Sequence, residues 1–426
     1  MPKVICDFHI HSKFSRATSS RMDVQSLVQY GTQKGLSVIG TGDFTHPQWL
    51  KELENQLEEY FNTSLFKPKE TLTENLRFML TAEVCTSFKY EEKSRRIHHL
   101  LFTPNFDSAK QISEKLAKFG NLESDGRPNL RLSPPELVEE VKETSKRNVI
   151  IPAHIWTPWF SLFGSKSGFE RIEDCYKDMT KHIFALETGL SSDPPMNWRL
   201  SALDKYALIS NSDAHSPYPY RIGREANVFD LKELSYREII DSIRLKDKKR
   251  FKFTIETHPA YGKYHWTGHR KCNIMMSPQD SKRLQGICPS CGRKMTRGVD
   301  ERVDELSDRY QGYKPESAIE YKHLMPLHEI IAKSLGIQQI YSPSVWRVYE
   351  QLIGRFGDEY SVLLEASKDE IALVSNDELA TAIITLRDNK FAVIPGYDGV
   401  YGRLIFSEDN VREVSTNRKF GLERFM

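Results

Sequence analysis

The sequence predicts an α/β fold with a parallel sheet, open or closed into a barrel, followed by a small zinc-binding module and a mostly helical C-terminal domain. Three observations predict it. Apolar runs alternate with amphipathic stretches up to about residue 230, which is typical of repeated βα units. Cysteine and histidine residues with metal-ligand spacing lie between residues 265 and 291. After residue 300 the apolar residues recur mainly with a helical period.

The expected strands of the first part are residues 3–11, 36–43, 76–84, 96–103, 148–154, 182–187 and 206–212. The amphipathic stretches between them include residues 23–34, 47–60, 107–119 and 134–147. In folds of this kind the chemistry gathers at the carboxyl ends of the strands. Those ends are therefore where we look for a site.

The first strand ends in Cys6-Asp7-Phe8-His9-Ile10-His11. Residues i and i+2 of a strand point to one face, so His9 and His11 project together. Two neutral imidazoles on one face can hold one metal ion. The simpler explanation is two unrelated histidines, and the choice between them depends on what the other strands carry.

Every other expected strand also ends in, or contains, a histidine or an acidic residue. These residues are Asp43 followed by His46, Glu83, His98 with His99, His154, Glu187, and Asp213 with His215. Each alone is explained by a core histidine or a helix-capping carboxylate. Together, imidazoles and carboxylates without thiols suit Zn²⁺, Mn²⁺ or Fe²⁺. They are too many for one ion, so the sequence predicts a site of two or more metals, of the kind that hydrolyses phosphoesters.

This set of residues resembles the PHP (polymerase and histidinol phosphatase) family. The resemblance implies a distorted (β/α)7 barrel with up to three metals, and Asp213, Glu83 and His9 as catalytic residues. The metal ligands that it implies are His9, His11, Glu83 and Asp213 for one metal; Glu83, His98 (or His99) and His154 for a second; and His215 with Asp43 for a third. The family usually has histidines where this chain has Phe44 and Ala17, so the third position depends on Asp43 and His215 alone.

An aromatic loop follows His154 and contains Trp156, Trp159 and Phe160. Exposed aromatic side chains beside a metal site can stack on bases or wedge between them. A lid with a small core of its own is an equally good explanation. Arg221 lies in another of the expected loops, where contact with a phosphate competes with the simpler hypothesis of solvated surface charge.

A zinc module is predicted by His269-x2-Cys272 followed by Cys288-x2-Cys291. This spacing of two ligand pairs is typical of structural zinc. His265 could replace His269, and a redox-active cysteine pair would need a thioredoxin-like βαβ context that is absent here. Gly292 directly after the second pair suits a backbone with positive φ. Arg270 is one of several basic residues around the module, which suggests contact with a nucleic acid.

The chain as a whole resembles the endonuclease Q family. The resemblance lies in the order of its parts, which are a PHP barrel, this zinc module, helices and the loop Pro395-Gly-Tyr-Asp-Gly-Val-Tyr-Gly402, and it covers nearly the whole chain. That resemblance implies a DNA repair nuclease that nicks double-stranded DNA 5′ to uracil, hypoxanthine, xanthine or an abasic site, with Zn²⁺ bound and Mg²⁺ or Mn²⁺ for activity. Two alternatives remain. One is a small-molecule phosphatase, which needs no such additional domains, and the other is a DNA- or clamp-binding scaffold with an inactive barrel.

The last eight residues, from Lys419 to Met426, resemble a sliding-clamp-binding peptide with Leu422 and Phe425 as anchors. A tail that packs on its own domain explains them equally well. We therefore expect domains at 1–250, 251–300 and 301–415, with a tail at 416–426.

Composition narrows the setting of the protein. Lys and Arg total 60 against 58 Asp and Glu, a net charge of +2, so any DNA-binding surface must be local. The absence of a long apolar run or a secretory signal leads us to expect no membrane span. The scattered cysteines fit a reduced cytoplasm.

Overall fold

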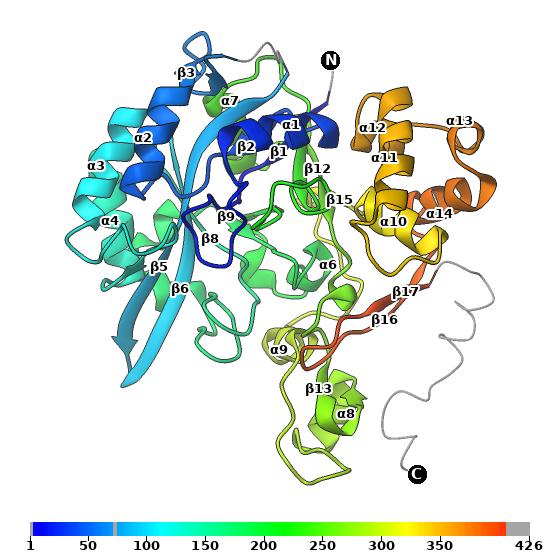
Figure 1. The fold of residues 1–426 in the computed structure, drawn as a ribbon. Helices are drawn as coiled ribbons and strands as arrows, with labels where there is room; N and C mark the ends of the chain where they lie inside the picture. Colours follow the sequence, from blue (N-terminus) through cyan, green and yellow to red (C-terminus); the bar gives the residue numbers. More distant parts are fainter. Residues whose placement is uncertain (1–2, 71–74, 406–426) are drawn as a thin grey trace.

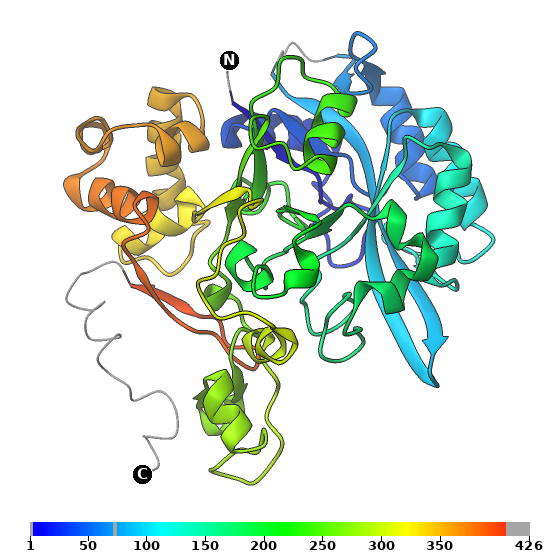
Figure 2. The ribbon, with the colours of Figure 1, turned by 180° about the vertical axis from the view of Figure 1, so that it is seen from behind.

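The computed structural model describes residues 3–70 and 75–405. A mixed α/β body forms one part of the molecule, and a group of helices, α10 to α14, lies beside it (Figure 1). A smaller lobe with β13 and α8 projects from the body, and the hairpin of β16 and β17 runs between this lobe and the helices, as the view from behind also shows (Figure 2). Leu422 and Phe425 lie outside the described residues.

The main sheet has eleven strands. They are β1 (Val4–Asp7), β2 (Val38–Gly40), β3 (Leu57–Glu59), β4 (Phe66–Pro68), β5 (Arg77–Tyr90), β6 (Lys93–Thr103), β7 (Asn129–Leu130), β8 (Val149–Pro152), β11 (Ala226–Phe229), β12 (Phe251–Glu256) and β15 (Glu320–His323). Two further strands, β9 (Ala185–Glu187) and β10 (Ala207–Ile209), form a parallel pair of their own. The sheet thus continues past residue 250, where the sequence suggests a domain boundary.

The strands curve into a partly closed ring. β1, β2 and β5 are parallel neighbours, and β6 joins β5 to β8. Two single backbone hydrogen bonds link the parallel pair β9–β10 to the main sheet. Beyond β8, Ile155 N–H donates to Glu187 O (3.0 Å), and beyond β1, His11 N–H donates to Ala214 O (2.9 Å). The predicted α/β class is confirmed, but a continuous closed barrel is not found among the described residues.

The expected parallel sheet is mixed: β1, β2 and β5 are parallel, whereas β6 is antiparallel to both β5 and β8, and β11 is antiparallel to both β1 and β12. The departure matters most at β5 and β6. β5 and β6 form an antiparallel hairpin in which Tyr90 pairs with Lys93. The two loop residues, Glu91 and Glu92, have φ values of 46° and 60°, as a tight two-residue hairpin turn requires. His98 therefore lies within its strand instead of at the end.

The first four helices of the body match the expected amphipathic stretches, and the second to fourth of them end three or four residues earlier than expected. Asp23 caps the first helix by accepting a hydrogen bond from Ser26 N–H, and Gly35 closes it in the left-handed conformation. The helices are α1 (Val24–Lys34), α2 (Pro47–Gln56), α3 (Phe106–Leu116), α4 (Pro134–Thr144), α5 (Ile172–Tyr176), α6 (Pro194–Asn197) and α7 (Tyr236–Arg244), with 3-10 turns at Lys177–His182 and Ser201–Leu203.

The rest of the chain supplies the lobe, the helices and the hairpin. The lobe elements are β13 (Thr267–His269), β14 (Ile274–Met276), α8 (Pro278–Arg283) and α9 (Val299–Leu306), with 3-10 turns at Pro259–Tyr261 and Arg270–Cys272. The C-terminal elements are α10 (Leu327–Ser334), α11 (Pro343–Phe356), α12 (Glu359–Leu364), α13 (Lys368–Val374), α14 (Asp377–Arg387), β16 (Ala392–Ile394) and β17 (Arg403–Ile405). The domain divisions inferred from the sequence stay a prediction.

A buried apolar core supports the site from below. Phe8, Phe102 and Phe229 are fully buried, and the rings of Phe8 and Phe102 meet edge to face at 5.8 Å. Because Phe8 directly precedes His9 in the chain, this packing fixes the strand that leads to the site. In the described part of the chain, no helix is long and apolar enough to cross a membrane.

Candidate metal centre and adjoining cleft

The site begins where β1 leaves the sheet. The strand ends at Asp7, yet the chain stays extended and Ile10 makes a single bridge to Ala214. His9 and His11 therefore keep the alternation of a strand and both lie buried on one side. Their ring centroids are 5.4 Å apart, as the sequence pattern predicts.

The first group of potential ligands is formed by His9, His11, Glu83 and Asp213. Glu83 Oε2 is 3.4 Å from His9 Nε2 and 3.2 Å from His11 Nε2. Asp213 Oδ1 is 3.5 Å and 3.1 Å from the same two nitrogens. All four ligand atoms lie within 4.8 Å of one another and can surround one cation.

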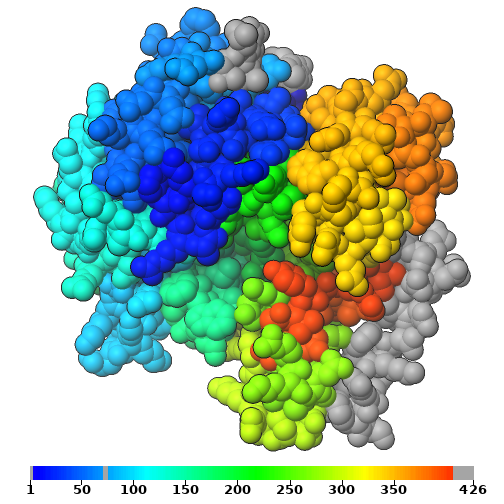
Figure 3. Space-filling model, viewed as in Figure 1, coloured from blue at the N-terminus to red at the C-terminus, as the bar shows by residue number. Residues whose placement is uncertain are grey.

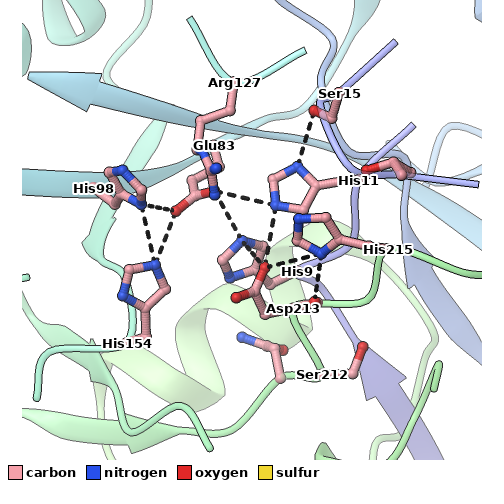
Figure 4. A network of polar contacts seen from close by, with 12 residues as sticks. His9, His11, Ser15, Glu83, His98, Arg127, His154, Ser212, Asp213 and His215 are labelled. Carbon is pink, nitrogen blue, oxygen red and sulfur yellow. Dashed lines mark hydrogen bonds and ion pairs between the residues drawn. The ribbon is translucent and has the colours of Figure 1, made fainter. Parts of the chain in front are cut away.

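The second group shares Glu83 with the first. Glu83 Oε1 is 2.7 Å from His98 Nδ1 and 3.0 Å from His154 Nε2, and these two nitrogens are 3.2 Å apart. Figure 4 shows Glu83 between the two groups, with His98 and His154 on one side and His9, His11 and Asp213 on the other. One carboxylate thus faces two sets of imidazoles.

The hairpin explains why His98, and not His99, faces Glu83. His98 lies opposite Cys85, and Cys85 shares its face of β5 with Glu83. His99 lies opposite Val84 on the other face, where its ring nitrogens contact the hydroxyls of Thr86 (2.9 Å) and Tyr176 (2.7 Å).

Two carboxylates hold the outer nitrogens of the first histidine pair. His9 Nδ1 is 3.1 Å from both oxygens of Glu187, and His11 Nδ1 is 3.1 Å from Asp43 Oδ1. Metal-binding histidines characteristically donate their second ring N–H to such a partner, which fixes the ring and its tautomer. This arrangement leaves the Nε2 atoms to face the centre of the site.

Asp43 and His215, the expected ligands of a third metal, belong to neither group among the described residues. Asp43 Oδ2 accepts hydrogen bonds from Ser12 N–H (2.6 Å), Ser12 Oγ (2.7 Å) and Ser15 Oγ (2.8 Å). His215 Nδ1 is 3.0 Å from Asp213 O. Asp43 is therefore placed as the partner of His11, and its oxygens are already engaged. His46, which follows Asp43, caps α2.

Three site residues have a positive φ that side chains rarely adopt. The values are 50° for Asp43, 31° for His154 and 49° for Asp213. Such conformations cost free energy and collect at functional sites, where the surrounding structure enforces them. All three directly follow, or lie just beyond, the carboxyl end of a strand.

The charges of the site favour a bound cation. Burial would raise the pKa of Glu83, but His98, Arg127 and His9 outweigh it and hold that pKa well below its ordinary value. Burial would likewise lower the pKa of His9, yet the carboxylates of Glu187, Asp213 and Glu83 raise it well above its ordinary value. Burial dominates at His98 and lowers its pKa to about 4, so this imidazole is neutral, as a ligand must be.

The residues present fit a pair of divalent cations. His9 Nε2 is buried and has no hydrogen-bond partner, although it points at two carboxylate oxygens. Buried polar atoms without a partner are rare and call for an explanation. A cation between these atoms supplies one, and the mixture of imidazoles and carboxylates suits Zn²⁺ or Mn²⁺.

The sequence offers Glu187 as a strand-end residue but no role for it, and it gives no indication of Arg127. Glu187 ends an expected strand but shows its role only through its contact with His9. Arg127 lies in a connection with no recognisable pattern, and its Nη1 is 3.1 Å from Glu83 Oε2. The strand-end rule was a sufficient signal for Glu187, whereas no local signal marks Arg127.

A large cleft opens from the metal centre. Its volume is about 990 Å³, and its wall includes His98, His154 and Asp213 together with residues of the helical part such as Tyr341. The space-filling view shows the surface hollowed between the α/β body and the helices (Figure 3). The site thus lies in the wall of a groove between two parts of the chain.

The aromatic loop after His154 divides into a buried and an exposed half. Trp156 is 1% exposed and donates through Nε1 to Asn197 Oδ1 at 2.8 Å. The expectation that Trp156 contacts bases is corrected, because its ring belongs to the core. Trp159 is 42% exposed and Phe160 is 37% exposed, and both line the cleft. Phe160 stacks on His98 with the ring centroids 5.2 Å apart.

Two arginines expected to contact DNA are also placed. Arg221 lines the cleft, whereas the exposed Arg270 lies in the zinc lobe and its backbone N–H donates to Asp398 Oδ2.

The structure gathers the four predicted zinc ligands in the projecting lobe. The ligand atoms of His269, Cys272, Cys288 and Cys291 lie within 4.8 Å of one another. His269 Nδ1 is 3.3 Å from Cys291 Sγ. Gly292 has a φ of 71°, which confirms the expected turn. His265 is outside the group, and burial lowers its pKa to about 4.

The fold and the site together define a mixed α/β protein with two groups of potential metal ligands that share one carboxylate, Glu83. The lesion-specific endonuclease PfuEndoQ from Pyrococcus furiosus superimposes with a TM-score of 0.85 at 34% identity, over 96% of this chain and 97% of that one. An endonuclease Q in complex with a 27-mer duplex bearing an abasic lesion gives a TM-score of 0.83 at 35% identity, over 96% and 98% of the two chains. The chain belongs to the endonuclease Q family.

Two further relatives extend this comparison by sequence. The uncharacterized protein YqxK of Bacillus subtilis is 29% identical over 425 residues, which is 95% of this chain and all of that protein. The uncharacterized protein MJ0043 of Methanocaldococcus jannaschii is 34% identical over 264 residues. Those residues are 60% of this chain and 32% of MJ0043, so the match spans about a third of that relative. A family model described as the MJ0043 C-terminal domain matches residues 326–390.

Proposed function

We propose that the protein is a DNA repair endonuclease that hydrolyses the phosphodiester 5′ to a deaminated base (uracil, hypoxanthine or xanthine) or an abasic site through a multi-metal site. The observation that carries the proposal is Glu83, which faces two groups of imidazoles beside a large cleft whose wall includes His98, His154 and Asp213. A phosphomonoester needs no groove of this size. Endonuclease Q bound to a damaged duplex supports the same substrate class.

The proposed ligands are His9, His11, Glu83 and Asp213 for one cation and Glu83, His98 and His154 for the other. Bound cations would supply Lewis-acid stabilisation of the attacking and leaving oxygens of an in-line displacement. Glu187 and Asp43 hold the rings of His9 and His11 in place. Zn²⁺ is the proposed resident ion, with Mg²⁺ or Mn²⁺ for activity.

The cleft would hold the DNA. The exposed rings of Trp159 and Phe160 beside His98 and His154 offer stacking surfaces for an unpaired base. Arg221 in the cleft wall, and Arg270 in the lobe, are proposed phosphate contacts. A damaged base costs less to unpair than an intact one, which contributes selectivity. A sliding clamp bound through Leu422 and Phe425 stays a prediction.

A nicking assay tests the proposal. End-labelled duplexes with one uracil, one hypoxanthine or one abasic site, and an undamaged duplex, are incubated with Mg²⁺ or Mn²⁺ and with EDTA. We expect metal-dependent cleavage immediately 5′ of the lesion only. If no duplex is cleaved but a phosphomonoester is hydrolysed, the proposal that DNA is the substrate is wrong and the protein is a phosphatase.

Asp213→Ala tests the first ligand group. We expect the nicking rate to fall by about 10²-fold or more, because one carboxylate of four ligands is lost. Binding of the abasic duplex in EDTA should persist, since the cleft wall keeps its aromatic and basic residues. Nicking at the wild-type rate by this variant would contradict the metal assignment.

Cys288→Ala tests the proposed zinc lobe. Structural zinc contributes on the order of 10 kcal/mol to folding of small modules, so we expect loss of one zinc per chain and unfolding of the lobe. Metal content and far-UV circular dichroism measure both effects. Cys175→Ala is the control, because Cys175 is a buried thiol outside the lobe. An unchanged zinc content in Cys288→Ala would refute the site.

A further inference from the structure

Arg127 reaches the metal centre from the connection between α3 and β7, and its backbone is firmly held. Gly126 N–H donates to Phe14 O at 3.1 Å. A Cβ on Gly126 would lie 2.2 Å from Asp43 Oδ2 and 2.3 Å from Ser15 Oγ. Glycine is therefore required for this close approach to the residues around His11, and the next residue is directed toward the site.

Asp125 fixes the same segment from its other side. Its Oδ1 accepts hydrogen bonds from Arg16 N–H and Arg127 N–H, both at 3.2 Å. The two residues that precede the arginine, Asp125 and Gly126, are thus tied to the loop that follows His11. The position of Arg127 is defined by the same part of the fold as the first ligand group.

The guanidinium group lies directly over the shared carboxylate. Arg127 Nη1 is 3.1 Å from Glu83 Oε2, and the side chain is 27% exposed. Figure 4 shows the side chain descending onto Glu83 from a separate segment. Arg127 also lines the cleft together with His98, His154 and Asp213. It therefore contacts the carboxylate that both ligand groups share and is open to a ligand in the cleft.

Most of the donors of Arg127 remain for a ligand. A guanidinium has five N–H donors, and within the described residues the side chain makes one hydrogen bond, to Glu83. Arg224, in the same cleft, differs because its Nε and Nη2 donate to Ser212 O at 3.1 and 2.9 Å. Arg224 supports the backbone next to Asp213, whereas Arg127 presents donors to the cleft.

We propose that Arg127 is a catalytic residue that donates hydrogen bonds to the two non-bridging oxygens of the scissile phosphate. The proposal rests on the proposed function. A guanidinium matches two phosphate oxygens in a planar, bidentate fashion. In the hydrolysis a bond forms between the water oxygen and phosphorus, the bond from phosphorus to the 3′-oxygen breaks, and a proton reaches the 3′-oxygen. Arg127 stays protonated throughout and stabilises the charge that collects on the phosphoryl oxygens.

The rival role is positioning, in which Arg127 only holds Glu83 for the cations. The two roles differ in three measurable ways. A phosphate-contacting arginine, when removed, lowers kcat while the metal content stays unchanged. Its loss is partly repaired by guanidinium ion in solution, and lysine in its place restores only part of the rate because the bidentate geometry is lost.

The experiment compares the wild type with Arg127→Ala, Arg127→Lys and Asp213→Ala on the abasic duplex. Single-turnover nicking with and without guanidinium chloride, metal content, and duplex binding in EDTA are measured. For Arg127→Ala we expect a fall of roughly 10²–10³-fold, as for loss of one preorganised donor to a transition state. Metal content and duplex binding should stay near wild type, and guanidinium should increase the rate in this variant but not in Asp213→Ala.

Each other outcome decides the question. A wild-type rate in Arg127→Ala, or a loss of activity that follows a loss of metal without guanidinium rescue, would overturn the catalytic role of Arg127 while the nuclease function stands. Failure of the wild type to nick any damaged duplex would overturn the proposed function itself.

Discussion

Glu83→Gln is expected to reduce nicking of a lesion-bearing duplex by about 10³-fold or more, which corresponds to at least about 4 kcal/mol of transition-state stabilisation. Both oxygens of Glu83 are engaged, Oε2 with the imidazoles of His9 and His11 and Oε1 with those of His98 and His154. An amide replaces one oxygen with an NH₂ group that cannot ligate a cation. The substitution therefore takes a ligand oxygen from one group and removes the negative charge that both groups share, whereas Asp213→Ala damages one group.

The measurement is single-turnover nicking together with metal content per chain. We expect the content of the metal centre to fall, with the zinc of the lobe retained. Glu225→Gln is the matched control, because Glu225 is buried in the same body outside both ligand groups. Burial and the neighbouring Glu256 raise the pKa of Glu225 well above its ordinary value, so an amide resembles its native state. Wild-type nicking and metal content in Glu83→Gln would contradict the shared-carboxylate centre.

The sequence predicts most of the centre because strands impose a simple rule. Alternation places His9 and His11 on one face, and His154 and Asp213 lie just beyond strand ends, whereas Glu83 lies within β5, which continues to Tyr90. The same alternation selects His98 over His99, but only after the β5–β6 hairpin is known. The hairpin depends on two glutamates with positive φ, and no turn signal at these positions announces it.

Other residues could not be assigned because their roles depend on long-range contacts. The contacts of Asp43 with His11, Ser12 and Ser15 are visible only in the structure, and its role as a ligand of a third metal stays a prediction. Trp156 has an aromatic ring that could stack on a base, but the ring is buried. That burial depends on packing against distant residues, which the loop sequence alone does not reveal. Arg127 reaches Glu83 across 44 residues of chain, and only the closely packed Gly126 explains its direction.

Glu359→Ala is expected to lower the free energy of unfolding by about 3–5 kcal/mol, since it leaves a buried charge without its partner. Lys34 Nζ lies 2.7 Å from Glu359 Oε1, and the two side chains are 1% and 0% exposed. The pair joins α1 of the body to α12 of the helical part. Glu359 Oε1 also accepts a hydrogen bond from Leu327 N–H at 3.0 Å, so the substitution removes a second buried contact.

Urea denaturation followed by tryptophan fluorescence measures this effect, because Trp346 lies at the same junction against Tyr30 and Tyr218. The matched control is Glu365→Ala. Glu365 pairs with Lys3 at 3.1 Å between the same two parts, but the side chains are 60% and 49% exposed. An exposed pair contributes about 1 kcal/mol or less. Equal effects of the two substitutions would contradict the dominant role of the buried pair.

A double variant, Lys34→Met with Glu359→Leu, distinguishes the loss of a contact from the cost of an unpaired charge. Replacing both charges with apolar side chains of similar size is often neutral for stability, so we expect it to recover most of the loss. We expect the nicking rate to recover less than the free energy of unfolding does.

Lys34 Nζ also donates to Pro219 O at 2.9 Å, and Tyr360 of α12 donates to Gly223 O. These bonds hold the segment that follows Asp213 and carries Arg221 and Arg224. A variant that is stable but slow would therefore indicate that the helical part positions this wall of the cleft, whereas full recovery of both properties would limit the buried pair to a role in stability.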